Sequence, residues 1–142
     1  MNKHSISLVL IFIGLLIVAV IVSSLNSDET NKDPKSSIKW DNDYNHAIQV
    51  AKNTHKKIFI YFYADWCVYC TQMDDLTYAS SEVKEKLMKN YVLLKLDVDA
   101  NPQLSQKYQA YSLPTIIILD YNGREIKRII GYQSPEQLLT QL

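Results

Sequence analysis

The sequence predicts an α/β fold with a central mixed β-sheet flanked by helices, preceded by an N-terminal transmembrane helix. Three observations support this prediction. Apolar runs of strand length alternate with stretches of helical periodicity, and the last two of these runs are joined by an Asn-Gly turn. In addition, residues 5–27 contain no charged side chain. Residues 39–142 are enough for one compact domain but too few for two.

Charge and composition exclude some classes of function. The 142 residues include 15 lysines and arginines and 15 aspartates and glutamates, so the formal net charge is zero. No net field would draw such a chain to a nucleic acid. The three glycines form neither a phosphate-binding loop nor a dinucleotide fingerprint. We therefore expect no nucleic acid partner and no bound nucleotide cofactor.

The N-terminal segment predicts a membrane anchor. Lys3 and His4 precede residues 5–27, and the first acidic residue is Asp28. As a helix the uncharged segment would extend roughly 34 Å at about 1.5 Å per residue, enough to cross a hydrocarbon core of about 30 Å. Lys3 favours a cytoplasmic N-terminus. We expect residues 1–25 to be a signal anchor in the cell membrane, with the remainder on its extracytoplasmic side.

A cleaved signal peptide is the alternative interpretation of this segment. The short basic start suits both interpretations, and Val22-Ser23-Ser24 offers small residues for cleavage. The apolar run is longer than the roughly 7 to 15 residues of a usual signal-peptide core, which favours the anchor. Either interpretation exports the rest of the chain. Residues 26–38 are polar and predict a flexible linker that leads to a domain over residues 39–142.

The first part of the domain alternates helix, strand and helix. Residues 41–55 place apolar side chains at spacings of three and four, which predicts a helix with Asp41 or Asn42 as its N-cap. Residues 58–63 form a continuous β-branched and aromatic run, which is typical of a strand covered on both faces. Helical spacing returns over residues 70–78.

The rest of the domain predicts further strands and helices and ends in a hairpin and a helix. The expected elements are a helix over 81–89 capped by Ser81, a strand over 91–98, a helix over 101–111, a strand over 115–119, a turn over 121–123, a strand over 125–130 and a final helix capped by Ser134. Asn122-Gly123 favours a tight hairpin, so we expect the last two strands to be antiparallel.

Cys67 and Cys70 lie between the first predicted strand and a predicted helix. The N-terminus of a helix stabilises a thiolate, so we expect Cys67 to be the nucleophile. Cys70 lies three residues further along, where it can attack the same sulfur and resolve a mixed disulfide. A structural zinc site would need more ligands, and beyond this pair the chain has only His4, His46 and His55. We therefore expect no metal site.

The sequence around the cysteines resembles the thioredoxin superfamily. The similarity lies in Tyr63-Ala64-Asp65-Trp66-Cys67-Val68-Tyr69-Cys70 and in Ser112-Leu113-Pro114-Thr115. In more detail, residues 40–142 resemble the C-terminal thioredoxin-like domain of the membrane thiol-disulfide interchange protein DsbD. This resemblance implies a thioredoxin-like fold and a redox-active disulfide between Cys67 and Cys70.

The resemblance also implies residues that bind the substrate. Pro114 corresponds to a cis-proline that faces the cysteines, and Leu113 to a residue that offers its backbone to an extended substrate segment. Trp66 corresponds to a tryptophan beside the nucleophile, and Gly131 to a glycine near the substrate groove. A trans proline at a strand start, a core aromatic and an ordinary turn glycine are the alternative interpretations of these positions.

Two positions concern proton transfer. The family commonly has a buried acid six residues before the first cysteine, where this chain has Tyr61. Asp74 is our candidate for a catalytic carboxylate, because it lies four residues after Cys70 and on the same helix face, and because the related reductase domain has a carboxylate there. A solvated helix residue is the alternative. Lys95 matches a lysine near the buried cysteine of thioredoxin, or else faces solvent from its strand.

Together these features predict an extracytoplasmic, membrane-anchored thiol-disulfide oxidoreductase that reduces disulfides of exported proteins. The chain has one predicted span and one cysteine pair, so the resemblance implies a membrane electron donor of the thiol reductase type as a partner. A disulfide oxidase or isomerase is one alternative. A non-enzymatic copper-binding or assembly factor is another, because copper(I) accepts two thiolates.

Overall fold

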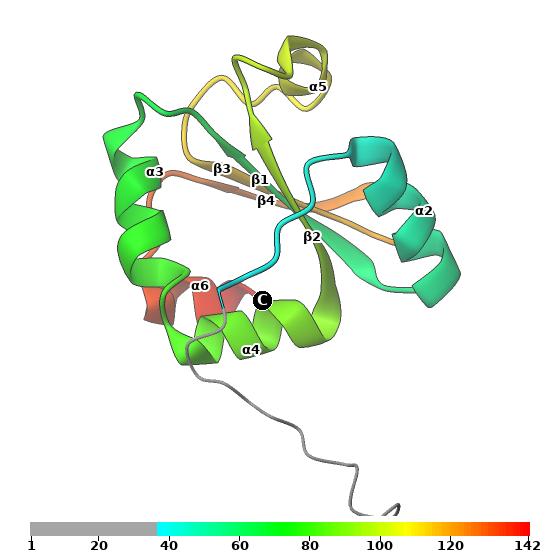
Figure 1. The fold of residues 1–142 in the computed structure, drawn as a ribbon, viewed down its shortest axis with the longest axis horizontal. Helices are drawn as coiled ribbons and strands as arrows, with labels where there is room; N and C mark the ends of the chain where they lie inside the picture. The colour runs from blue at the N-terminus through cyan, green and yellow to red at the C-terminus, as the bar shows by residue number, and fades with distance from the viewer. Residues whose placement is uncertain (1–36) are drawn as a thin grey trace, which may run out of the picture. The chain divides into compact units, whose positions relative to one another are not determined.

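The computed structural model describes residues 37–142 and folds them into a four-stranded sheet with helices on both faces (Figure 1). The predicted anchor over residues 1–25 and nearly all of the predicted linker over 26–38 lie outside the described residues. Within the described part, none of the helices is both long enough and apolar enough to cross a bilayer.

The order of elements agrees with the alternation that the sequence predicts. They are α2 (Tyr44–Thr54), β1 (Lys57–Tyr63), α3 (Val68–Gln72), the π-helix η1 (Met73–Thr77), α4 (Ser81–Asn90), β2 (Tyr91–Asp97), α5 (Pro102–Lys107), β3 (Thr115–Leu119), β4 (Glu125–Ile130) and α6 (Pro135–Gln141). The strand order in the sheet is β2-β1-β3-β4. β1 is parallel to β2 and antiparallel to β3, and β3 is antiparallel to β4. The predicted mixed sheet with a terminal hairpin is confirmed.

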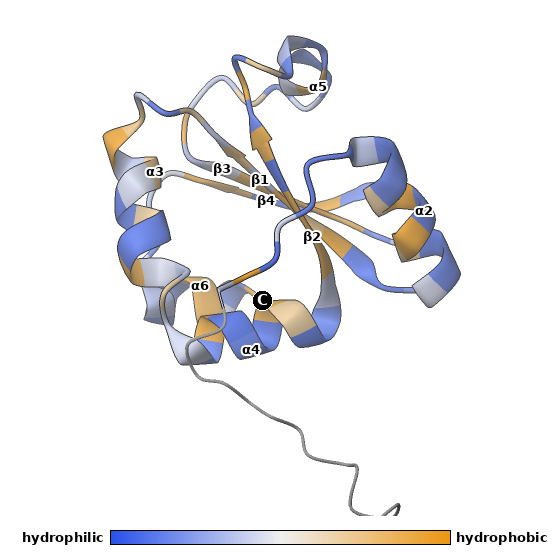
Figure 2. Ribbon diagram, viewed as in Figure 1, coloured by the Kyte–Doolittle hydropathy of each residue, from blue (hydrophilic) through white to orange (hydrophobic). Residues whose placement is uncertain are grey.

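β1 lies inside the sheet and buries side chains on both of its faces, as its unbroken apolar run predicts. Ile58, Ile60 and Phe62 pack in a cluster with residues of α2. Phe59 and Tyr61 belong to the cluster on the opposite face, together with residues of α3, η1, α4 and α6. Figure 2 shows the strands as largely hydrophobic, whereas α2 and α4 mix hydrophobic and hydrophilic residues, as helices with one solvent face do.

The first helix begins later than predicted. Asp43 is its N-cap, in place of Asp41 or Asn42. Asp41 instead extends the edge of the sheet beside β2, with backbone hydrogen bonds of 2.9 Å to the carbonyl of Leu93 and from the amide of Lys95. The extended backbone that this pairing requires delays the start of the helix.

The helix predicted over residues 70–78 consists of two elements. α3 starts at Val68, directly after Cys67, and the chain changes to a π-helix at Met73. The Tyr78 amide donates a hydrogen bond of 2.8 Å to the Met73 carbonyl and closes the wider turn. Apolar spacing of three and four residues does not distinguish the two helix types. Such π-turns often occur at functional sites.

The helix predicted over residues 101–111 is shorter than expected. α5 ends at Lys107, and Gln109 adopts a left-handed φ of 50°. This turn lets Tyr108 and Ala110 enter the core. Burial of these two side chains outweighs continuation of a surface helix.

The two remaining caps differ in outcome. Ser80, and not Ser81, is the N-cap of α4, and its side chain makes no capping hydrogen bond. At α6 the predicted cap is confirmed, because Ser134 and Gln137 form a reciprocal capping box.

Candidate active site

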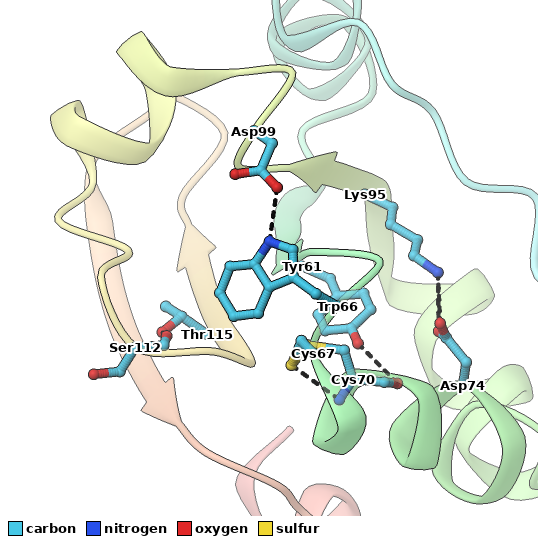
Figure 3. The surroundings of a disulfide bond; sticks show 9 residues. All are labelled: Tyr61, Trp66, Cys67, Cys70, Asp74, Lys95, Asp99, Ser112 and Thr115. Carbon is cyan, nitrogen blue, oxygen red and sulfur yellow. Dashed lines mark hydrogen bonds and ion pairs between the residues drawn. A yellow bond between two sulfur atoms is a disulfide. The ribbon is translucent and has the colours of Figure 1, made fainter.

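Cys67 and Cys70 form a disulfide at the start of α3, with their Cα atoms 5.2 Å apart (Figure 3). Cys67 is the N-cap of the helix, and its sulfur accepts a hydrogen bond of 3.2 Å from the Cys70 amide. Cys67 is 6% exposed and Cys70 is 1% exposed. Cys67 is therefore the less buried residue of the two, and a backbone donor is already placed to stabilise negative charge on its sulfur.

The loop before β3 supplies the second part of the site. The Leu113-Pro114 peptide bond is cis, so the alternative of a trans proline is wrong. The Pro114 carbonyl accepts a hydrogen bond of 2.8 Å from the Gly131 amide, and the Thr115 hydroxyl donates to the Ser112 carbonyl. These two bonds hold the loop on both sides of the proline. Figure 3 shows Ser112 and Thr115 on this loop, in the surroundings of the disulfide.

Gly131 lies just after β4 and has a φ of +88°, a left-handed conformation that other residues adopt only with strain. A Cβ atom added there would meet no heavy atom within 4 Å. The backbone conformation, and not crowding, therefore calls for glycine. Its hydrogen bond to Pro114 places Gly131 at the same end of the sheet as the cysteines, where the interpretation from resemblance expects it.

Trp66 is 67% exposed, so the alternative that it is a core aromatic is wrong. Its indole Nε1 donates a hydrogen bond of 2.8 Å to the Asp99 carboxylate, which follows β2 (Figure 3). This bond orients the indole of Trp66, the residue directly before Cys67. Sequence reasoning missed Asp99, although its position directly after the strand parallel to β1 was a usable signal, because the carboxyl ends of parallel strands share one edge.

Exposed apolar side chains occur on the segments that form the site. Val68 and Tyr69, which separate the two cysteines, are largely exposed. Tyr111 precedes the cis-proline loop and Ile130 precedes Gly131, and both also leave most of their surface in solvent. Apolar surface exposed in this way is typical of protein interaction sites.

Tyr61 occupies the position where the family commonly has a buried acid. Its side chain is fully buried, and its hydroxyl donates a hydrogen bond of 3.2 Å to the Cys70 carbonyl. Burial, followed by the negative charge of Asp74, raises the pKa of the phenol far above its ordinary value. The phenol therefore stays protonated at physiological pH and does not act as a base. The Tyr61 hydroxyl instead holds the cysteine helix, which is α3 together with η1, on the sheet.

Asp74 is paired with Lys95 of β2. The Lys95 Nζ donates to both carboxylate oxygens of Asp74, at 2.8 and 3.0 Å, and the two side chains are 21% and 34% exposed. The ammonium also lies 4.4 Å from the centre of the Tyr63 ring and 5.4 Å from that of Tyr61. Neither Asp74 nor Lys95 is a freely solvated residue. Figure 3 shows the pair on the side of α3 that bears Cys70.

Sequence reasoning missed an aromatic cluster behind the cysteines. Trp40, Tyr63 and Tyr78 surround the Tyr61 ring, with centroid distances of 5.9, 5.9 and 5.0 Å. Tyr78 is buried, and its hydroxyl has no hydrogen-bond partner within residues 37–142. Burial raises the pKa of Tyr78 well above its ordinary value. Trp40 precedes every predicted element, so no periodicity indicated that it packs here.

Between residues 37 and 142, no group of three or more His, Cys, Asp or Glu side chains is placed to hold a metal ion. His46 pairs with the carboxylate of Asp41, and the His55 ring packs 5.3 Å from that of Tyr121. Both histidines belong to the α2 segment, away from the cysteine and cis-proline loops in sequence.

Comparison with known proteins assigns this geometry to a family. Residues 44–142 match the family model described as a thioredoxin-like domain. Thioredoxin from Alicyclobacillus acidocaldarius is 35% identical over 95 residues, which cover 67% of this chain and 87% of that protein. The thiol:disulfide interchange protein DsbD from Yersinia pestis is 34% identical over 99 residues, which cover 66% of this chain. The aligned residues span 16% of the length of that DsbD.

Solved structures show the same fold. A DsbH oxidoreductase superposes with a TM-score of 0.68 at 22% identity, covering 82% of this chain and 89% of that chain. This likeness concerns the fold alone. Thioredoxin Deadhead from Drosophila melanogaster is 31% identical with a TM-score of 0.59, covering 75% of this chain and 94% of that one.

Proposed function

We propose that this chain, which belongs to the family of thioredoxin-like domains and is a thiol-disulfide oxidoreductase, reduces disulfides of exported proteins outside the cytoplasm. The observation that carries the proposal is the pairing of a disulfide at a helix start with a cis-proline loop. Around these two features lies the exposed apolar surface that a protein client needs.

The proposed reaction uses both sulfurs of the pair. The Cys67 thiolate attacks one sulfur of the client disulfide, the client S–S bond breaks, and the departing client sulfur takes a proton. Cys70 then loses its proton and attacks the Cys67 sulfur of the mixed disulfide. The second client cysteine leaves as a thiol, and Cys67 and Cys70 become the disulfide found in the structure. Two electrons pass from the pair to the client.

The slightly greater exposure of Cys67 and the backbone donor to its sulfur support Cys67 as the nucleophile. When the disulfide is reduced, the Cys70 amide that now contacts the Cys67 sulfur would face a thiolate, which accepts a hydrogen bond more strongly. Cys70 is almost fully buried, so it meets the Cys67 sulfur more readily than it meets a client. The difference in exposure supports attack by Cys67 and resolution by Cys70.

Asp74 is the proposed acceptor for the Cys70 proton. Tyr61 touches the Cys70 backbone but stays protonated, so another base is needed. The Lys95 ammonium that holds Asp74 lies 5.4 Å from the centre of the Tyr61 ring, which supports the proximity of the carboxylate to this part of the site. Lys95 holds the carboxylate by two hydrogen bonds and would orient it while the proton moves. In this proposal the carboxylate comes from Asp74 of η1, and not from the position on β1 where this chain has Tyr61.

The cis-proline loop is the proposed docking surface for the client chain. An extended client segment would form backbone hydrogen bonds at Leu113, beside Pro114, in the manner of an added strand. Trp66 would cover one side of the bound segment, because Asp99 orients its indole there. Gly131 would leave room on the other side, since it has no side chain next to the loop.

The direction of electron flow is supported by similarity to DsbD and by the Val68-Tyr69 pair between the cysteines, which resembles that of a reductant. Each turnover leaves Cys67 and Cys70 oxidised, so a partner has to reduce them again. We assign this step to a membrane electron donor of the thiol reductase type. A disulfide oxidase or isomerase would use the same pair in another direction.

The proposed location is the outer side of a cell membrane, with residues 1–25 as a single-pass anchor and residues 26–38 as a linker. The uncharged stretch over residues 5–27 supports this, because its length suits a span. Intact mass of the protein extracted from membranes tests the anchor. Retention of residues 1–25 is expected, whereas a mature start near Ser24 would indicate the cleaved alternative.

Two turnover assays on the full chain test the function. The reduced chain should catalyse reduction of insulin disulfides with dithiothreitol as the electron source. The oxidised chain should oxidise a reduced, unfolded client much more slowly than the reduced chain reduces insulin in the first assay. Faster oxidation than reduction would identify a disulfide oxidase, and repair of a scrambled client without net reduction would identify an isomerase.

A further inference from the structure

Thr77, the last residue of η1, makes a hydrogen bond that the proposed reaction does not use. Its side chain is fully buried, and its hydroxyl donates to the Gln133 carbonyl at 2.6 Å. The two residues are 56 positions apart in the sequence, so the bond joins segments that are otherwise distant along the chain. A buried hydroxyl with a short bond of this kind specifies one relative placement of the two segments, because hydrogen bonds are directional.

One end of this bond belongs to the cysteine helix. α3 begins directly after Cys67, and η1 continues it from Met73 to Thr77. The wide turn ends with the Tyr78 amide bonded to the Met73 carbonyl, so Thr77 is still inside the hydrogen-bonded segment. A shift of Thr77 would therefore be transmitted along the helix toward Cys70.

The other end belongs to the segment that holds the cis-proline loop. Gln133 lies two residues after Gly131, whose amide donates to the Pro114 carbonyl at 2.8 Å. The Gln133 side chain accepts a hydrogen bond of 2.6 Å from the Gln141 amide group, near the end of α6. The segment from Gly131 to Gln133 is thus bonded to the proline loop and to α6, and Thr77 bonds it to the cysteine helix as well.

We propose that Thr77 is a positioning residue, which fixes the position of the cis-proline loop relative to α3 and η1, the helix that carries the cysteines. The inference rests on the proposed function, because it concerns the groove in which the client binds. Apolar packing between η1 and α6 holds the two elements together but is not directional. The hydroxyl determines where the segment after β4 lies, and through Gly131 it determines where Pro114 lies.

Two substitutions in the full chain separate the hydroxyl from the shape of the side chain. Thr77→Val keeps the branched shape and removes the donor, whereas Thr77→Ser keeps the donor and removes the methyl group. Initial rates with a peptide disulfide give KM and kcat, and amide hydrogen exchange at Gly131 reports the loop directly. In Thr77→Val we expect KM to rise about threefold to tenfold and Gly131 exchange to accelerate by a similar factor, with kcat and the reduction potential unchanged. Thr77→Ser should resemble the unmodified chain.

Equal effects of Thr77→Val and Thr77→Ser on KM and on Gly131 exchange would overturn the inference, since packing would then explain both. Unchanged KM and exchange in Thr77→Val, with only a lower thermal midpoint, would also overturn it. If Thr77→Val does not fold, Thr77→Ala is compared with Thr77→Ser, because that pair differs only by the hydroxyl. If the unmodified chain does not reduce the peptide, the proposed function fails, while Gly131 exchange still tests the link.

Discussion

The two faces of the sheet are packed with different kinds of side chain. Under α2, β1 contributes Ile58, Ile60 and Phe62 to a cluster that is mainly aliphatic. On the cysteine face the same strand contributes Tyr61, which meets three other aromatic rings and lies next to the ion pair between Asp74 and Lys95.

This difference shows how one strand serves two purposes. Successive residues of a strand point to opposite faces, so Ile60 and Tyr61 are neighbours in sequence but belong to separate clusters. The α2 face contributes mostly burial of apolar area. The cysteine face also positions hydrogen-bond donors and a charge pair around the disulfide. Changes on the α2 face should alter stability alone, whereas changes on the cysteine face can alter the chemistry as well.

The largest expected effect is a loss of client reduction when the proposed nucleophile on the cysteine face, Cys67, is replaced. Cys67→Ser should lower the rate of client reduction by at least about a thousandfold, because the chain then lacks the attacking sulfur. Cys70→Ser should accumulate a mixed disulfide with the client, detectable on a non-reducing gel. A Cys67→Ser chain that still reduced insulin would contradict the assignment.

The matching change on the α2 face is Leu94→Ala. Leu94 is fully buried, so its truncation should lower the free energy of unfolding by about 2 to 5 kcal/mol, as measured by urea denaturation. The reduction potential of the folded variant should be unchanged, because Leu94 belongs to the cluster without the cysteines. A clear shift in potential would show that the two faces are coupled.

Asp74→Asn should change the chemistry much more than the stability. Loss of the proposed proton acceptor should slow release of the mixed disulfide about a hundredfold at pH 7. The deficit should narrow above about pH 9, where free thiols ionise without help. Stopped-flow rates across pH measure both effects. Asp75→Asn is the matched control, because Asp75 is an exposed neighbour on η1, and it should behave like the unmodified chain.

The two buried phenols of the cysteine face should respond in opposite directions. Tyr78→Phe removes a hydroxyl that has no partner in the described part of the chain, so it should raise the free energy of unfolding by about 1 kcal/mol. Tyr61→Phe removes the phenol hydroxyl that donates to the Cys70 carbonyl, which then keeps the Met73 amide as a donor, and should lower the free energy of unfolding by about 1 kcal/mol. Urea denaturation of both variants measures the pair. Destabilisation by both changes would indicate that the Tyr78 hydroxyl does form a hydrogen bond.

The smallest expected effect concerns alkaline pH. The folded-state pKa of Tyr61 and of Tyr78 is raised above the unfolded value of about 10. Their contribution to stability is therefore complete below pH 10 and is lost as pH rises, when the unfolded chain ionises and the folded chain does not. Between pH 10 and 11 the free energy of unfolding should therefore fall with pH, and in Tyr61→Phe this fall should be smaller by about 1 kcal/mol. An identical decline in the variant would contradict the raised pKa.

The sequence predicted those parts of the molecule that depend on local pattern. The limits of β3 and β4 and the Ser134 cap follow from apolar runs and turn residues, and the structure has them as predicted. The resemblance identified the cis bond at Pro114. Local rules failed where a contact from a distant segment decides the outcome. Asp41 pairs with β2 and so does not cap the first helix.

Two side-chain pairings of the site were missed for the same physical reason, because each joins separate segments of the chain. The bond of Trp66 to Asp99 joins residues 33 positions apart, and that of Lys95 to Asp74 joins residues 21 apart. Neither spacing has a periodicity that a sequence displays. The sequence indicated the chemical groups, whereas their pairing required the fold.

The equilibrium reduction potential of the Cys67–Cys70 pair tests the central claim most directly. The full chain is equilibrated in glutathione or dithiothreitol redox buffers, and alkylation counts the free thiols. A client reductase that depends on a membrane electron donor should have a potential near that of thioredoxin, roughly −270 mV. A potential near roughly −120 mV would make the pair a strong oxidant and would contradict the proposed direction.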